Sequence, residues 1–178
     1  MQYRKATMAD IPAIHALIND YAAQGLMLRR PLLFLYESVR DFVVAIDETT
    51  GKLVGVGGLH IMWQDLAEVR SLAVHPDCKG KGVGKGIVEF LLEEGKQMGL
   101  KRIFTLTYQQ AFFEKCGFSV VQKETLPQKV FKECVYCDKF TCCDEIAMIR
   151  YLVPSEELPS GGVYEIPLIA IPTWQKGQ

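Results

Sequence analysis

A loop rich in glycine and lysine is the part of this sequence whose residue types and spacing point most directly to chemistry. It runs from Cys78 to Gly86 with the sequence CKGKGVGKG. Glycines let backbone N–H groups turn toward an anion, and a helix predicted to begin at Val83 directs the positive end of its dipole to the same place. Lys79, Lys81 and Lys85 add positive charge. We interpret the loop as a phosphate or pyrophosphate site, with a solvated turn as the alternative.

Two common phosphate-binding motifs do not fit this loop. A P-loop requires Gly-x4-Gly-Lys-Ser/Thr, but Gly86 follows Lys85, and Lys79 occupies the position of the first glycine. The Rossmann pattern Gly-x-Gly-x-x-Gly also fails, because its three possible registers place Lys85, Ile87 and Glu89 at the last glycine. The loop therefore belongs to another class of anion site.

Hydrophobic periodicity predicts the elements that must position the loop. Strands are expected over 2–6, 42–46, 53–62, 66–75, 102–108 and 118–122, and helices over 32–41, 83–98, 110–116 and from Asp10, as N-cap, to Gly25. The strand 66–75 leads into the loop and the amphipathic helix 83–98 leaves it. This order predicts an α/β fold with a mixed sheet and helices on its faces.

Length and charge limit the possible functions. The 178 residues, 49% of them hydrophobic, suffice for one domain, expected over 1–152, with an extended tail over 153–178 that packs on the domain or completes a homodimer. A net charge of −1 argues against a general nucleic-acid binder. The N-terminus has no apolar signal region, and the apolar stretches are shorter than the about 20 residues of a membrane span. We expect a cytoplasmic protein that does not bind nucleic acid or membranes.

Two motifs resemble the GNAT N-acetyltransferase superfamily. Arg70–Pro76 (RSLAVHP), followed by Lys79–Gly84 (KGKGVG), resembles its acetyl-CoA motif, and Phe112–Phe118 (FFEKCGF) resembles its second signature. The resemblance covers about residues 2–125 and implies a mostly antiparallel sheet. Lys79 stands where the family usually has Gln or Arg. A lysine keeps the positive charge of an arginine but lacks its planar guanidinium group.

This resemblance implies that acetyl-CoA is the co-substrate. It places Leu72, Ala73 and Val74 along the pantetheine arm, with backbone hydrogen bonds from Leu72 and Val74. The segment from Lys79 to Lys85 would hold the pyrophosphate through the N–H groups of Gly80, Gly82, Val83 and Gly84, with Lys79, Lys81 and Lys85 supplying charge.

Acetyl transfer to an amine needs a base for the amine and an acid for the leaving thiolate. Glu68 is the candidate base, since simple alternation places it on the same side of its strand as Arg70, Leu72 and Val74; a strand-edge glutamate paired with Arg70 is the alternative. Tyr108 is the candidate acid, with Thr107 second, although Tyr108 also suits an ordinary strand-end aromatic.

Other possible proton carriers are weaker candidates. Many family members have a tyrosine where this chain has Phe113. His75 precedes a proline and is interpreted as a turn residue. His15 and His60 have no partners that the sequence identifies.

A narrower resemblance concerns the acceptor. Gln24–Arg30, Phe104–Tyr108, Leu126-Pro127 and the later CCDEIA segment are similar to the acetyltransferase domain of N-acetylglutamate synthases, in short stand-alone forms. That implies transfer to the α-amine of L-glutamate, the first step of arginine biosynthesis. Arginines bind carboxylates with two hydrogen bonds, so a dicarboxylate acceptor suits Arg29, Arg30 and Arg70, with Lys129 and Lys132 as further contacts implied by the resemblance.

Several alternatives stay open from sequence. Arg29-Arg30 could be a solvated charge pair between helices. The chain could acetylate another small-molecule amine or a protein N-terminus. Phe113 also leaves open a non-catalytic acyl-CoA-binding module.

A cysteine cluster ends the set of candidate sites. Cys134, Cys137, Cys142 and Cys143 could supply four thiolates to zinc. The second pair lacks Cys-x2-Cys spacing, however, and adjacent cysteines rarely bind one ion. Acetyl transfer needs no metal, and we expect none.

Overall fold

A computed structural model describes residues 1–126, 142–154 and 156. Its strands are β1 (Gln2–Lys5), β2 (Phe42–Ile46), β3 (Leu53–Trp63), β4 (Leu66–Val74), β5 (Arg102–Thr107), β6 (Ser119–Val120) and β7 (Ile146–Tyr151). Its α-helices are α1 (Ile11–Ala23), α2 (Leu32–Glu37), α3 (Val83–Gln97) and α4 (Gln110–Lys115). No helix among these residues is long and apolar enough to cross a membrane.

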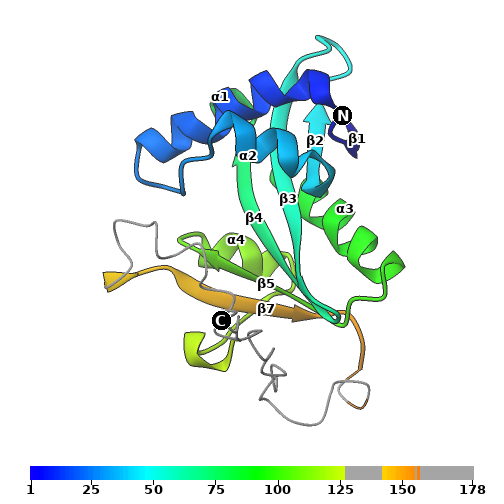
Figure 1. Ribbon diagram of the computed structural model, residues 1–178, viewed down its shortest axis with the longest axis vertical. Coiled ribbons are helices and arrows are strands. Elements are labelled where there is room, and N and C mark those ends of the chain that lie inside the picture. Colours follow the sequence, from blue (N-terminus) through cyan, green and yellow to red (C-terminus); the bar gives the residue numbers. More distant parts are fainter. Residues whose placement is uncertain (127–141, 155, 157–178) are drawn as a thin grey trace, which may run out of the picture.

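The strands form one sheet in the order β1-β2-β3-β4-β5-β7-β6. Every neighbouring pair is antiparallel except β4 and β5, which run parallel. That parallel pairing involves only Leu66–Glu68 and Arg102–Phe104, after which the two strands diverge (Figure 1). The predicted mixed, mostly antiparallel sheet is confirmed, and the divergence opens a gap in its centre.

Helices pack on both faces of the sheet because its central strands are apolar on both sides. On one face, α1 and α2 bury Ile14, Ile18 and Leu35 against Phe42 and Val56 of the sheet. Figure 1 shows these two helices lying together beside β2, β3 and β4.

The other face carries α3 and α4. Here Ile87 and Leu91 of α3 are fully buried against the sheet. The helix approaches β3 closely, because a Cβ at Gly55 or Gly57 would lie 2.8 or 2.7 Å from the Ile87 side chain. Glycine in these two strand positions therefore sets the distance between α3 and the sheet.

Two predicted elements differ near the first helices. The helix expected over 32–41 ends at Glu37, and Val39–Asp41 forms a separate 3-10 turn. Asp10 precedes α1 as predicted, but its carboxylate does not cap that helix. It accepts hydrogen bonds from the Thr7 backbone N–H and from Arg4, whose hydrogen bond lowers the Asp10 pKa to about 2.

One strand, β7, was not predicted from the sequence. It inserts between β5 and β6 and pairs with β5 along six residues, Arg102–Thr107 against Ile146–Tyr151. β6 is correspondingly shorter than the strand predicted over 118–122. The predicted tail, 153–178, lies outside the described residues except for three positions, 153, 154 and 156.

Candidate active site

A bulge in β4 organises the site. Ala73 pairs with Val56 and Arg70 with Gly58, so β4 carries one more residue than β3 across this stretch. Ser71 takes up the extra residue with φ +53°, the single positive φ outside glycine within the described part of the chain. A residue added to one strand of a pair in this way is a β-bulge, and it interrupts side-chain alternation.

The bulge overturns the predicted alternation of Glu68, Arg70, Leu72 and Val74. Before it, Arg70 lies over the Phe34 ring of α2, and Glu68 shares that side. After it, Leu72 and Val74 pack against the core beneath α3. The catalytic and cofactor candidates on β4 therefore face opposite sides of the sheet, because the extra residue at Ser71 shifts the alternation of side chains by one position.

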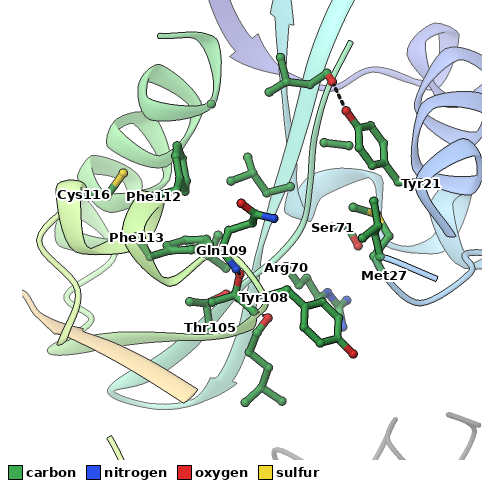
Figure 2. A pocket seen from close by; sticks show the side chains of 18 of the residues that line it. Tyr21, Met27, Arg70, Ser71, Thr105, Tyr108, Gln109, Phe112, Phe113 and Cys116 are labelled. Carbon is green, nitrogen blue, oxygen red and sulfur yellow. Dashed lines mark hydrogen bonds between the residues drawn. The ribbon is translucent and has the colours of Figure 1, made fainter. Parts of the chain in front are cut away.

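A cavity of about 660 Å³ lies along the gap between β4 and β5. It brings together thirteen of the predicted site residues: Arg30, Glu68, Arg70, Leu72, Ala73, Val74, Lys79, Gly80, Gly82, Val83, Gly84, Lys85 and Tyr108. Lys81 and Arg29 are exposed and do not line it, and Lys129 and Lys132 fall outside the described residues. Figure 2 shows Phe112 and Phe113 on one wall and Tyr21 and Met27 on the opposite one.

Backbone groups of β4 face this cavity. The His75 N–H donates to Val54 O on β3 at 2.8 Å, so the preceding peptide groups of Val74 point the other way, toward the gap. The Tyr21 hydroxyl donates to Val74 O at 2.6 Å, which ties α1 to the free edge of β4 (Figure 2). Lys79 Nζ lies 4.9 Å from the centre of the Tyr21 ring. Tyr21 is one of the buried residues of α1, and nothing in the sequence pattern signals this contact.

The glycine-lysine loop has the conformation that an anion site requires. Gly80 and Gly82 have φ of +75° and +79°, which glycine adopts without strain. Helix α3 starts at Val83, and the N–H groups of its first turn have no acceptor within the helix. A Cβ at Gly84 would lie 3.3 Å from the Phe112 ring, so only glycine leaves the backbone open there without moving Phe112.

The opposite end of the cavity carries positive charge. Arg30 and Arg70 are 8% and 6% exposed, and their guanidinium carbons lie 4.6 and 5.0 Å from the centre of the Phe34 ring. Arg70 Nη2 donates to Asp41 at 3.3 Å, and Arg30 Nε to Ser71 Oγ at 3.4 Å. Burial of Arg30 excludes the solvated-pair alternative for that residue, whereas Arg29 is exposed.

The candidate proton carriers lie between these two ends. Glu68 is half-buried in the cavity wall. The Tyr108 hydroxyl donates to Asp144 Oδ1 at 2.7 Å, and Thr107 Oγ1 accepts from the Gln109 N–H at 2.9 Å. Phe113, where many family members have tyrosine, is buried in edge-to-face contact with its neighbours and contributes only hydrocarbon.

The three histidines differ in their surroundings. His75 accepts a hydrogen bond from the Asp77 N–H at the start of a short 3-10 turn, as expected of a turn residue. His15 lies on α1 outside the cavity. His60 lines the cavity and has a partner that the sequence did not reveal: its Nδ1 lies 2.8 Å from Asp41.

Cysteines contribute two thiols to the cavity wall, Cys78 and Cys116. Burial raises the pKa of the Cys116 thiol, which keeps it protonated. Of the predicted cluster, Cys142 and Cys143 are exposed, and Cys134 and Cys137 lie outside the described residues. Within the described residues, no group of three or more histidine, cysteine or acidic side chains could hold a metal ion.

The fold and the glycine-lysine loop together identify the class of protein. The chain belongs to the acetyltransferase (GNAT) family, whose model matches residues 12–118. It is an acetyl-CoA-dependent N-acetyltransferase. Residues of this chain fit acetyl-CoA: the backbone groups of β4 that point away from β3 suit the amide-containing arm, and the loop before α3 suits the pyrophosphate.

Two relatives match this chain over most of their own length. The chain is 40% identical over 131 residues to an amino-acid acetyltransferase of Mycobacterium tuberculosis, covering 73% of this chain and 75% of the relative. It is 37% identical over 149 residues to an uncharacterized N-acetyltransferase of Chlorobaculum tepidum, covering 84% and 95%.

Solved structures agree with this comparison. A crystal structure of a Mycobacterium tuberculosis protein with CoA matches with a TM-score of 0.76 and 34% identity, covering 86% of this chain and 100% of that one. N-acetylglutamate synthase from Neisseria gonorrhoeae, complexed with CoA and N-acetyl-glutamate, matches with a TM-score of 0.77 and 25% identity. Here 86% of this chain corresponds to 35% of the longer protein.

Proposed function

We propose that the protein transfers the acetyl group of acetyl-CoA to the α-amine of L-glutamate, the first step of arginine biosynthesis. The observation that carries this proposal is the pair of buried guanidinium groups, Arg30 and Arg70, in the same cavity as Glu68. A planar guanidinium matches a carboxylate, with which it forms two parallel hydrogen bonds. An acceptor with two carboxylates suits two such groups.

The relatives support the same class of acceptor. One is named an amino-acid acetyltransferase, and one structural match is an N-acetylglutamate synthase bound to N-acetyl-glutamate. An amino acid presents an ammonium group next to a carboxylate, which suits a cavity that combines the Glu68 carboxylate with the arginines.

In this proposal the residues of the cavity divide the chemistry. Glu68 removes a proton from the α-ammonium group, which frees the nitrogen lone pair for attack on the thioester carbon. Tyr108, or Thr107 beside it, gives a proton to the departing sulfur. Backbone groups of Leu72 and Val74 and the loop from Lys79 to Lys85 hold the co-substrate. Binding both substrates in one cavity supplies the orientation on which much of the acceleration depends.

The test measures release of free thiol when the purified chain is mixed with acetyl-CoA and L-glutamate. We expect turnover with L-glutamate, less with L-glutamine and L-aspartate, and none with the deaminated analogue 2-oxoglutarate. Thiol release with a different amine but not with glutamate would reject the acceptor and favour another small-molecule or N-terminal acetyltransferase. Acetyl-CoA binding without turnover across an amine panel would identify a binding module.

Glu68→Gln tests the base separately. We expect kcat to fall about 100-fold or more, in line with the loss of a general base, while the Kd for acetyl-CoA stays within about twofold. Glu93→Gln is a matched control, since Glu93 lies on the exposed side of α3 and does not line the cavity. A kcat for Glu68→Gln equal to that of the wild type would show that Glu68 is not the base.

A further inference from the structure

His60 is an ionisable side chain of the cavity that the proposed mechanism does not use. It lies on β3 directly opposite Glu68 of β4 in the antiparallel register. Residues paired in this way point to the same face of the sheet, with their Cβ atoms about 5 Å apart. His60 and Glu68 therefore stand side by side in the wall of the cavity, before the bulge at Ser71 reverses the faces of β4.

The Asp41 carboxylate fixes how His60 presents its ring. Asp41 lies in the 3-10 turn before β2, and its Oδ2 is 2.8 Å from His60 Nδ1 and 3.3 Å from Arg70 Nη2. An ionised carboxylate only accepts hydrogen bonds, so Nδ1 must carry the proton. In the neutral ring the lone pair then sits on Nε2.

Nε2 of His60 is buried and has no hydrogen-bond partner among the described residues. A buried polar atom without a partner costs free energy, and such atoms in native structures call for an explanation. A donor on a molecule in the cavity would satisfy it. The acceptor's ammonium group, which must approach Glu68, carries three N–H donors, more than a single carboxylate beside it needs.

Acetyl transfer also requires two protons to leave the same nitrogen. The ammonium group loses one proton before the nitrogen attacks the carbonyl carbon. Once the N–C bond has formed and the C–S bond breaks with its electron pair on sulfur, the nitrogen must lose a second proton to become an amide. One of the two protons balances the proton given to sulfur, and the other leaves to solvent.

We propose that Nε2 of His60 is a second proton acceptor for the acceptor amine, beside Glu68, with Asp41 as the positioning residue that holds the ring. The inference rests on the proposed function of this cavity. Glu68 takes the proton that frees the lone pair, and His60 takes the second proton as the tetrahedral adduct breaks down. The ring loses this proton to solvent after the product has left the cavity. The charge that develops on the ring is balanced by the Asp41 carboxylate.

Other charged groups near His60 fit this assignment. Asp41 faces it from the 3-10 turn, Glu68 from β4, and Arg70 reaches the same Asp41 oxygen. Arg30 and Glu145 also line the cavity.

The experiment compares His60→Gln with the wild type by thiol release, using whichever amine the wild type acetylates. Glutamine accepts a hydrogen bond but takes up no proton. We expect kcat near neutral pH to fall about 100-fold, with the acceptor KM within about threefold and the acetyl-CoA Kd unchanged. The variant's kcat should then rise tenfold per pH unit above the pH at which the wild type levels off, since hydroxide must replace the ring.

Further variants keep the test decisive. His60→Ala should recover part of its kcat when imidazole is added, whereas His60→Gln should not, and His15→Gln on α1 should match the wild type. Asp41→Asn keeps the ring and should lower kcat about tenfold; it decides the question if the His60 variants do not fold. A variant at position 60 or 41 with wild-type kcat and pH profile would overturn the proposal. Failure of glutamate with turnover of another amine rejects only the acceptor, whereas a wild type that acetylates no amine overturns both.

Discussion

The two ends of the cavity are lined by different kinds of chemical group. The end that we propose binds the cofactor consists mainly of backbone groups and glycines from one continuous stretch, Leu72–Lys85. The end that we propose binds the acceptor is lined by side chains from separate elements: Arg30 before α2, His60 on β3, and Glu68 and Arg70 on β4. Asp41, before β2, contacts His60 and Arg70 from outside the cavity lining. One end of the cavity therefore comes from residues that are neighbours in the sequence, whereas the other end forms only when distant elements pack together.

This difference has a physical basis. Amides and helix ends bind phosphate whatever the side chains are, provided that the backbone can adopt the right conformation. Recognition of a small acceptor instead requires charges and proton carriers at fixed relative positions, which distant elements supply when the sheet register brings them together. The two ends should therefore respond to mutation independently.

Arg70→Met should produce the largest separation between the two ends. It removes a buried guanidinium that faces the cavity, and we expect kcat/KM for the acceptor to fall about 100-fold, or about 3 kcal/mol, with the acetyl-CoA Kd unchanged. Arg70→Lys keeps the charge but not the fork and should lose less. Steady-state kinetics with each substrate varied in turn, alongside thermal unfolding, gives the comparison. A parallel loss of acetyl-CoA affinity would contradict the separation of the two ends.

Gly84→Val should have the converse effect. The added side chain meets the Phe112 ring, 3.3 Å from the new Cβ, and covers the amides at the start of α3. We expect the acetyl-CoA Kd to rise about tenfold, or 1.4 kcal/mol, while the acceptor KM at saturating acetyl-CoA changes little. Gly84→Ala should give an intermediate Kd, because Phe112 has to move by only a few tenths of an ångström. Isothermal titration with CoA measures both, and equal affinities across the series would show that the loop does not bind there.

The same contrast explains what the sequence could predict. The loop, the strand before it and the helix after it are neighbours in the chain, so spacing alone placed Gly80, Gly82 and Gly84 correctly around the start of α3. The strands from β1 to β5 also followed from local periodicity. Arg30 was chosen for its charge, but its burial and its stacking on Phe34 depend on how α2 packs.

Other features could not be predicted from local patterns. β7 is a short apolar run that buries Met148 on one face and Ile149 on the other, so it lacks strand alternation. Its partner β5 lies about forty residues earlier in the chain. The Asp41–His60 contact likewise joins two unremarkable positions through sheet register. The Ser71 bulge carries no sequence signal, since serine is an ordinary strand residue in any pattern based on polarity.

The bulge at Ser71 lies between the two ends of the cavity. Substitutions there should have the smallest effects but should affect both ends. A residue at φ +53° is strained unless it is glycine, and most strained when its side chain branches at Cβ. We expect Ser71→Val to lower the free energy of unfolding by about 1–2 kcal/mol, and Ser71→Gly to be at least as stable as the wild type. Denaturant unfolding of the purified variants measures this difference.

The kinetic consequences of Ser71→Val should differ from those of the other variants. Valine favours extended backbone, and loss of the extra residue from the bulge would move either Glu68 and Arg70 or Leu72 and Val74 to the wrong face. Acceptor KM and acetyl-CoA Kd should therefore worsen together, unlike in Arg70→Met or Gly84→Val. Ser71→Ala keeps the Cβ but loses the hydrogen bond from Arg30, so it separates the hydroxyl from the backbone. If valine and glycine at position 71 gave equal stability and equal kinetics, the positive φ would have no part in coupling the two ends, and the reversal of faces along β4 would need another cause.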